Sequence, residues 1–428
     1  MTMSGHAEEE EVARLLGRKS RGEKRVSFPP DEAMVSGFAE SKDTWQDGVR
    51  LDYRSCESLE EILKAVRFNL INLQGAELEE NGASSLMDMI SYYESATHLD
   101  VSSNTSMGVS GWHALSRLLI QSGCLWRLDA CNIPIEDYPA QALSRALLSS
   151  RLTVLHLENT RLSGKPLFTL VCSLKKNIAL QELYLCDNEL NSFHDSMQLG
   201  ELLKYNSTLR TLDLSNNAIS DSGLEELCDG LRVQKSGLRT LVLHNNQITH
   251  RGMIHLGRVL PLLRTLETLD LSDNDVKDRG MHTLKEALIS NRSITQLSLA
   301  SVGITCEGAV ALAEFLAETR FLQTLDVRQN FVLTGGLMAF TLALKLNHTL
   351  VHLDLDQNPK EEKDEFLIET QKNLLSRISD LCAANAAAAS ETDQRSETLL
   401  THDNDNNNDS NEKDNDGEAA APRTLADK

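Results

Sequence analysis

A pair of leucines recurs along most of this chain at a nearly constant interval, and this period constrains the fold more than any other feature. In one copy, Leu212 and Leu214 alternate with polar residues, as in a short β-strand. Leu224, Leu227 and Leu231 then recur with the spacing of one face of a helix. Neither half can bury its apolar side alone, so the unit requires copies of itself as neighbours.

The chain contains such copies, separated by 27 to 29 residues. Most of them also carry a glycine close to the start of the expected helix. This pattern predicts an α/β leucine-rich-repeat solenoid of the ribonuclease-inhibitor-like form, with about eleven strand-helix repeats of about 28 residues. The first apolar residues of the expected strands are Ile71, Leu99, Leu128, Leu155, Leu183, Leu212, Leu241, Leu269, Leu297, Leu325 and Leu353.

An asparagine follows most of these strands, five residues after the first apolar residue. A side-chain amide in that place can bond to backbone groups that the turn leaves unpaired, so we predict a structural role for this row. Asn132 and Asn159 come one residue early, and Val302 replaces the amide, so we expect local irregularity at these turns. The regular members of the row are Asn104, Asn188, Asn217, Asn246, Asn274, Asn330 and Asn358.

The period also divides the chain into four parts. Residues 1–45 lack the repeat and have few large apolar side chains, so we expect a disordered arm. Residues 46–358 form the solenoid, and residues 359–389 form a helix that caps its last repeat. Residues 390–428 form an acidic tail rich in Asp and Asn, which we expect to be disordered.

Both ends of a solenoid need an apolar cover. At the N-terminal end, a partial cap is expected from Leu51, Tyr53, Leu59, Ile62 and Leu63. At the C-terminal end, the expected apolar side of the capping helix comprises Phe366, Leu367, Leu374, Leu375, Ile378 and Leu381.

Composition excludes several classes of function. The net charge of −21 argues against a nucleic-acid binder. No apolar run is long enough for a membrane span, and none forms a secretory signal near the first residues, so the eight scattered cysteines are expected to be reduced in an intracellular, cytoplasmic or nuclear protein. No zinc-binding spacing, phosphate loop or nucleophile elbow occurs, so we expect no catalytic residues, no cofactor and no metal.

The arm contains the most informative short motif of the chain, Lys24-Arg25-Val26-Ser27-Phe28, followed by two prolines. In an extended strand, Val26 and Phe28 point the same way and can fill two adjacent pockets. The prolines lack N–H donors and end further strand pairing. The motif resembles the docking sequence by which regulatory subunits bind the catalytic subunit of protein phosphatase 1.

A wider resemblance accompanies the motif. Together with the repeats, it is similar to a leucine-rich-repeat family of protein phosphatase 1 regulators over roughly residues 24–381. This resemblance implies a subunit that binds the phosphatase and inhibits it. This chain departs from the family in two places. The family carries a longer helical segment between the docking motif and the first repeats, and the short tail of this chain, rich in Asn and Asp, differs from the family's tail. Five segments resemble the family at residues that the repeat pattern alone does not require. They are residues 24–40, 81–99, 288–293, 305–315 and 334–340.

Two further features of the arm bear on docking. Met34 and Val35 follow Phe28 by six and seven residues, and they are either a second apolar contact on the same partner or a stray apolar pair.

Ser27 follows basic residues, as basophilic kinases prefer. Phosphorylation would add about −1.5 to −2 charges beside a strand docked near an acidic rim, so we predict that it weakens docking. Titration of the phosphatase with phosphorylated and unphosphorylated arm peptides checks this prediction, and equal dissociation constants would contradict it.

The residues between the two leucines of each strand are expected to line the concave face. Six of the ten are aspartates, which could form an acidic stripe for a second, basic protein partner. Aspartate is common at this position in many such repeats, however, so we favour a scaffold role for this face. We therefore predict a non-enzymatic regulatory subunit of protein phosphatase 1. A Ran-type GTPase-activating protein and a pure leucine-rich-repeat scaffold are the alternatives. The row comprises Asp100, Asp129, His156, Tyr184, Asp213, Val242, Asp270, Ser298, Asp326 and Asp354.

Overall fold

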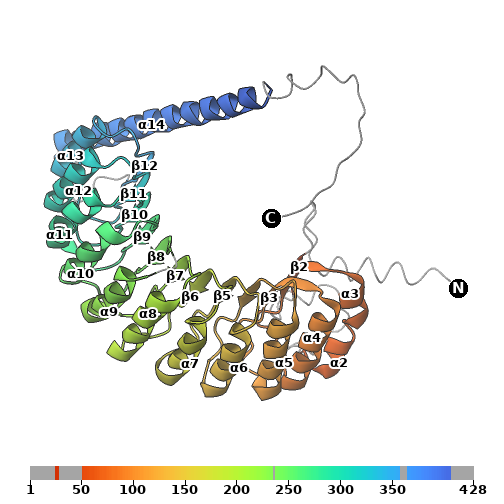
Figure 1. Ribbon diagram of the computed structural model, residues 1–428. Coiled ribbons are helices and arrows are strands. Elements are labelled where there is room, and N and C mark those ends of the chain that lie inside the picture. Colours follow the sequence, from red (N-terminus) through yellow and green to blue (C-terminus); the bar gives the residue numbers. More distant parts are fainter. Residues whose placement is uncertain (1–24, 28–50, 235–236, 357–363, 406–428) are drawn as a thin grey trace, which may run out of the picture.

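The computed structural model of the chain describes residues 25–27, 51–234, 237–356 and 364–405, without side chains at 25–27 and 391–405 (Figure 1). Twelve parallel strands form one sheet, in which each strand pairs with the next along the chain. The strands are β1 (Arg25–Ser27), β2 (Phe68–Asn72), β3 (Ala96–Asp100), β4 (Arg127–Asp129), β5 (Val154–His156), β6 (Glu182–Tyr184), β7 (Thr211–Asp213), β8 (Thr240–Val242), β9 (Thr268–Asp270), β10 (Gln296–Ser298), β11 (Thr324–Asp326) and β12 (His352–Asp354).

Helices follow the strands along the chain. The strands line the inner side of a curved solenoid and the helices its outer side (Figure 1). The predicted leucine-rich-repeat solenoid is thus confirmed, and its eleven expected strands are β2 to β12. The helices are α2 (Tyr53–Glu57), α3 (Glu60–Ala65), α4 (Glu80–Tyr93), α5 (Gly108–Gln121), α6 (Asp137–Leu147), α7 (Gly164–Leu174), α8 (Phe193–Tyr205), α9 (Ser220–Arg232), α10 (Gly252–Val259), the short η2 (Leu260–Leu262), α11 (Lys277–Ser290), α12 (Cys306–Glu318), α13 (Thr334–Leu344) and α14 (Glu365–Asp405).

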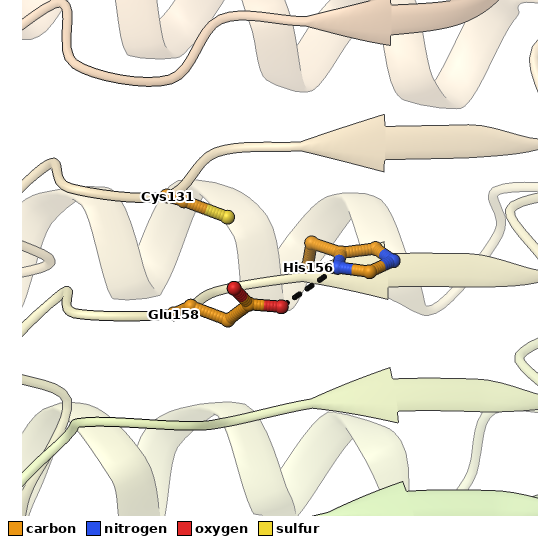
Figure 2. A group of neighbouring side chains, drawn as sticks. All are labelled: Cys131, His156 and Glu158. Atoms are coloured by element: carbon orange, nitrogen blue, oxygen red, sulfur yellow. Dashed lines mark hydrogen bonds and ion pairs between the residues drawn. The ribbon is translucent and has the colours of Figure 1, made fainter.

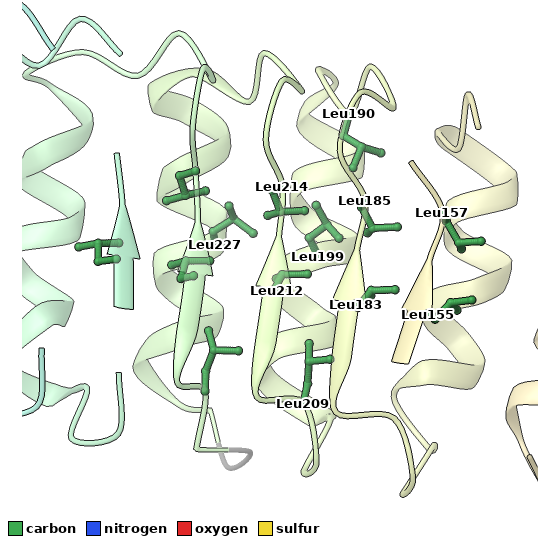
Figure 3. Packing of buried hydrophobic residues seen from close by; sticks show 14 of the residues in the cluster. Leu155, Leu157, Leu183, Leu185, Leu190, Leu199, Leu209, Leu212, Leu214 and Leu227 are labelled. Carbon is green, nitrogen blue, oxygen red and sulfur yellow. The ribbon is translucent and has the colours of Figure 1, made fainter. Parts of the chain in front are cut away.

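The leucine core is continuous from repeat to repeat. Leu212 pairs in register with Leu183 on one side and Leu241 on the other, and all three are fully buried. Figure 3 shows the same leucine positions stacked in successive strands, with helix leucines such as Leu227 packed beside them. Because equivalent residues meet at every step, one sequence period builds the whole core.

The asparagine row forms a ladder of buried amides. The Asn217 side-chain nitrogen donates to the carbonyl of Leu185 in the preceding repeat at 2.8 Å and to that of Leu214 at 2.9 Å. Its side-chain oxygen accepts from the backbone N–H of Asn188 at 2.9 Å. The predicted structural role is confirmed for the described members, and Asn358 lies outside the described residues. The same bond to a leucine carbonyl of the preceding repeat is made by Asn104, Asn188, Asn246, Asn274 and Asn330.

The irregularity expected at the turns with Asn132 and Asn159 lies in the amide ladder, because Ile133 and Thr160 stand at the ladder position and the Thr160 hydroxyl donates to the Leu157 carbonyl at 3.1 Å. The backbone at Asn132 and Asn159 is regular. Both residues have left-handed backbones, with φ of 58° and 50°, as Asn216 has at the same place in a regular repeat with φ of 58°. They occupy this ordinary left-handed position and are not displaced members of the ladder. At Val302 the buried side chain replaces the amide, while its backbone N–H still donates to Asn330 Oδ1 at 3.1 Å.

A second amide ladder lies where several of the helices give way to the next strand, and the sequence period did not reveal it. Asn347 donates to the carbonyl of Leu316 in the preceding repeat at 2.8 Å and accepts from the N–H of Leu350 at 2.8 Å. Asn385 of α14 continues the ladder by donating to the Leu350 carbonyl at 2.9 Å. Asn177, Asn206 and Asn291 make the equivalent bonds.

Helices α2 and α3 cover the N-terminal end of the core. Leu51 and Leu63 are buried there, and Leu59 and Ile62 pack partly buried against them. Tyr53 was expected in the same cap, but 48% of its surface is exposed.

Helix α14 covers the C-terminal end. Ile378 and Cys382 are buried against the last repeat, whereas Phe366, expected on the apolar side, is 74% exposed. The helix continues to Asp405, past the boundary expected at residue 389. Residues 383–389 are alanine except for Asn385, and alanine has the highest helix propensity, which favours continuation of the helix past its last buried side chains. Within the described ranges, no helix has the length and apolarity needed to cross a membrane.

Candidate functional site

The described part of the predicted docking motif, residues 25–27, lies at the first edge of the sheet. These three residues form β1, which pairs in parallel with β2, the strand of the first repeat. The sequence predicted an extended backbone for this segment but not a place in the chain's own sheet. The register joins Arg25 to Leu70, Val26 to Ile71, and Ser27 to Asn72.

The remaining residues of the predicted docking site, Lys24, Phe28, Met34 and Val35, lie outside the described residues. The side chains of the β1 residues are not described either, so their pockets and their contacts stay predictions. The described backbone shows that residues 25–27 pair with β2, which would otherwise be the edge strand of the parallel sheet. A segment that pairs in this way can present the same backbone groups to another strand edge.

A second candidate site lies on the concave face, around Asp129 at the end of β4. Its carboxylate lies 2.6 Å from His98 Nε2 and accepts from Arg127 Nε at 2.9 Å. Burial favours a raised pKa for Asp129, but the hydrogen bonds from His98 and Arg127 outweigh it and hold the pKa below its usual value. Asp129 is therefore a buried, ionised carboxylate held by groups from two strands.

His156 of β5 continues this cluster on the next strand. Its ring stacks on the ring of Tyr184 from β6, with the centroids 4.0 Å apart and an angle of 10° between the planes. One ring nitrogen, Nε2, lies 3.9 Å from Asp129 Oδ1, and the other, Nδ1, lies 2.9 Å from Glu158 Oε1. The Tyr184 ring thus covers one side of the imidazole, and each ring nitrogen points toward a carboxylate, Nε2 toward Asp129 and Nδ1 toward Glu158.

Cys131 completes the cluster from the turn after β4. Figure 2 shows its side chain near that of Glu158, which follows β5, with His156 beside them. The Cys131 sulfur, a His156 ring nitrogen and a Glu158 carboxylate oxygen all lie within 4.8 Å of one another. Burial raises the pKa of the Cys131 thiol to about 11.

Metal-ligand spacings along the chain do not reveal this group, because its residues come from two adjacent repeats. Asp129 pairs in register with His156, so Cys131 and Glu158, each two residues further on, occupy equivalent places in adjacent turns. Comparing equivalent positions one repeat apart, instead of neighbours in the chain, is the signal that would have found the group.

Four of the other five concave aspartates bond within their own turns. Asp213 Oδ1 accepts from the N–H of Ser215 at 2.9 Å and from its hydroxyl at 2.6 Å. This bond closes the turn after the strand and accounts for the recurrence of aspartate without any ligand. Asp100, Asp270 and Asp326 accept from the backbone N–H two residues later in the same way.

Comparison with known proteins matches individual repeats and, over a longer stretch, more than half of the chain. A leucine-rich-repeat family model matches residues 205–228 and 263–284. Protein phosphatase 1 regulatory subunit 37 of Bos taurus is 45% identical over an alignment of 300 residues, with 59% of this chain and 43% of that protein covered. The Danio rerio protein of the same name is 46% identical over 295 residues, covering 58% of this chain and 32% of that protein.

More distant relatives carry a related name. The Caenorhabditis elegans homolog of protein phosphatase 1 regulatory subunit 37 is 40% identical over 209 residues, covering 47% of this chain and 22% of that protein. Among solved structures, the yeast Rad7–Elc1 complex has a TM-score of 0.41 at 17% identity, over 74% of this chain and 87% of that chain. A likeness this weak supports no conclusion about function.

The matched region spans 43% or less of the length of these relatives, so the similarity concerns part of each protein. The order of the strands in the sheet and the family model both indicate leucine-rich repeats, and the sequence identity indicates the relatives that this part of the chain resembles. The chain is therefore a leucine-rich-repeat protein whose sequence is similar to that of protein phosphatase 1 regulatory subunit 37.

Proposed function

We propose that the chain is a non-catalytic regulatory subunit that binds the catalytic subunit of protein phosphatase 1 through Lys24-Arg25-Val26-Ser27-Phe28 and inhibits or redirects its activity. The observation that carries this proposal is the basic-Val-x-Phe motif in the arm of a chain similar to proteins named as regulatory subunits of that phosphatase. The extended backbone of β1 supports it, since strand addition requires this conformation.

The energetics require more than the two apolar side chains. Burying Val26 and Phe28 contributes about 1.5–3 kcal/mol each. Micromolar affinity corresponds to about −8 kcal/mol, so flanking contacts must add to these two. The basic pair Lys24 and Arg25 supplies charge for an acidic rim, and the pair Met34 and Val35 supplies a second apolar contact.

Calorimetric titration of the purified phosphatase catalytic subunit with the whole chain tests the proposal. We expect the unmodified chain to bind with a micromolar or lower dissociation constant. The double variant Val26→Ala/Phe28→Ala should bind at least tenfold more weakly, because it removes both pocket-filling side chains. An activity assay on the same complex then separates inhibition from redirection.

A matched variant controls for the general stickiness of the arm. Leu15→Ala/Leu16→Ala removes an apolar pair of similar size from the same arm, upstream of the motif. We expect it to bind like the unmodified chain. Binding that is lost equally in both double variants, or absent in all three proteins, would refute docking through Val26 and Phe28.

The two alternative functions give different results in the same set of experiments. A Ran-type GTPase-activating protein would accelerate GTP hydrolysis by its GTPase, and a pure scaffold would bind no phosphatase. Neither alternative explains a basic arm with this motif, so we place both behind the phosphatase proposal.

A further inference from the structure

We propose that Cys131, His156 and Glu158 form a zinc-binding site on the concave face, with three protein ligands and one open coordination position. The three residues carry a thiol, an imidazole and a carboxylate, which are the ligand types that Zn²⁺ takes in proteins. They come from two adjacent repeats, so a bound ion would join the turn after β4 to β5 and the turn that follows it (Figure 2).

The distances suit a tetrahedral ion after small side-chain rotations. The three ligand atoms lie within 4.8 Å of one another. Zinc bonds of about 2.0–2.3 Å place tetrahedral ligands about 3.5 Å apart, so contraction of about 1 Å is enough. The backbone already sets the spacing, because the pairing of Asp129 with His156 fixes the register of the two turns that carry the thiol and the carboxylate.

The surroundings of His156 are those of a metal ligand. Stacking on Tyr184 fixes the plane of the ring, and Nδ1 faces Glu158. The opposite nitrogen, Nε2, lies 3.9 Å from Asp129 Oδ1, and shortening this distance to a hydrogen bond would let the carboxylate orient the ligating imidazole and raise its basicity. Asp129 is itself held by His98 and Arg127, so it is a positioning residue and not a ligand.

Charge balance also favours a cation at this place. Glu158 and Asp129 bring two carboxylates within reach of one imidazole, and Tyr184 Oη is turned to a third carboxylate, donating to Glu182 at 3.0 Å. Arg127 faces Asp129 and offsets only part of this charge. A divalent ion among Cys131, His156 and Glu158 would neutralise both the carboxylate and the thiolate that it binds.

Binding must release a proton. A cysteine thiol is protonated at neutral pH, whereas zinc binds the thiolate. Formation of the Zn–S bond therefore transfers the S–H proton to the buffer. Affinity should rise with pH through the neutral range, and the calorimetric heat should change with the ionisation enthalpy of the buffer by one proton per ion.

The test is zinc binding by the whole chain, purified with a chelator and kept reduced with a phosphine. We expect one zinc ion per chain after gel filtration, and a cobalt-substituted protein with a thiolate-to-cobalt absorption band and tetrahedral d–d bands. Cys131→Ser should abolish the thiolate band and weaken zinc binding at least a hundredfold. Glu158→Gln should weaken it while keeping the band, and Asp129→Asn should weaken it about tenfold as an orienting group.

A matched cysteine variant makes the assignment specific. Cys186 stands two repeats further on, at the place equivalent to Cys131 and Glu158, and it is also partly buried. Cys186→Ser should leave stoichiometry, affinity and the cobalt spectrum unchanged. Circular dichroism and thermal unfolding of the metal-free variants show whether each one is folded, so that lost binding is not mistaken for lost structure.

Three outcomes would overturn the proposal. The first is a reduced, folded chain that binds no stoichiometric zinc. The second is a Cys131→Ser variant with unchanged affinity. The third is an equal loss in Cys186→Ser, which would assign the ion to scattered thiols instead of this cluster.

Discussion

Replacing Asn274 with alanine is expected to lower the free energy of unfolding by about 2–5 kcal/mol. The Asn274 side chain accepts from the backbone N–H of Asn246 at 3.0 Å and of Ile248 at 3.0 Å, and it donates to the Leu243 carbonyl at 2.9 Å. Alanine leaves these buried groups without their partner and has no atoms with which to replace it. Unsatisfied buried donors cost more than the net gain of an average hydrogen bond, which is why the expected effect is large.

Urea unfolding followed by circular dichroism measures this change. Because a repeat array can unfold in parts, hydrogen exchange of the amides of Asn246 and Ile248 should be followed as well. The neighbouring exposed Asp273, with a left-handed φ of 54°, provides the control. Asp273→Asn keeps a residue type that tolerates this backbone and should change stability by less than about 0.5 kcal/mol. Equal midpoints for Asn274→Ala and the control would contradict the structural role of the ladder.

Replacing Phe340 with alanine is the other substitution with a large expected effect, about 3–5 kcal/mol. Phe340 of α13 has no exposed surface and lies in the core of the last repeat, against which the C-terminal cap packs. Removing the ring creates a cavity that rigid strands and helices on both sides cannot close. The midpoint of urea unfolding should fall accordingly.

Phe331 is the matched control for this substitution. It belongs to the same repeat, just before α13, and 54% of its surface is exposed. Phe331→Ala should therefore change stability by less than about 1 kcal/mol. If both variants unfold at the same urea concentration as the unmodified chain, Phe340 does not have the core role that its burial implies.

The solenoid could be predicted from the sequence because its determinants are local and repeated. Leu212 meets Leu183 and Leu241 in register, so one period specifies the neighbours of every strand. The first asparagine ladder follows from the same period. The second ladder was missed because Asn347 and its equivalents stand at helix ends, where an amide also has an ordinary surface explanation.

Features that join different parts of the chain could not be predicted in this way. Cys131 and His156 carry no motif in sequence, and only the register of β4 and β5 brings them together. The pairing of β1 with β2 joins an arm to a repeat that begins about forty residues later, and a three-residue strand has no periodicity that indicates its partner. Helix α14 passes the predicted boundary because helix propensity continues where the apolar pattern ends.

The place of β1 has a consequence for the solubility of the molecule. A parallel sheet has two open edges, and an uncovered edge strand offers its backbone groups to any other chain, which is a common route to aggregation. At the N-terminal edge, β1 covers the edge of β2, the strand Phe68–Asn72. Any event that draws β1 away exposes this edge, so removal of the arm should promote self-association of the repeats. We therefore expect β1 to protect the edge of β2 from pairing with other chains as long as it stays in the sheet.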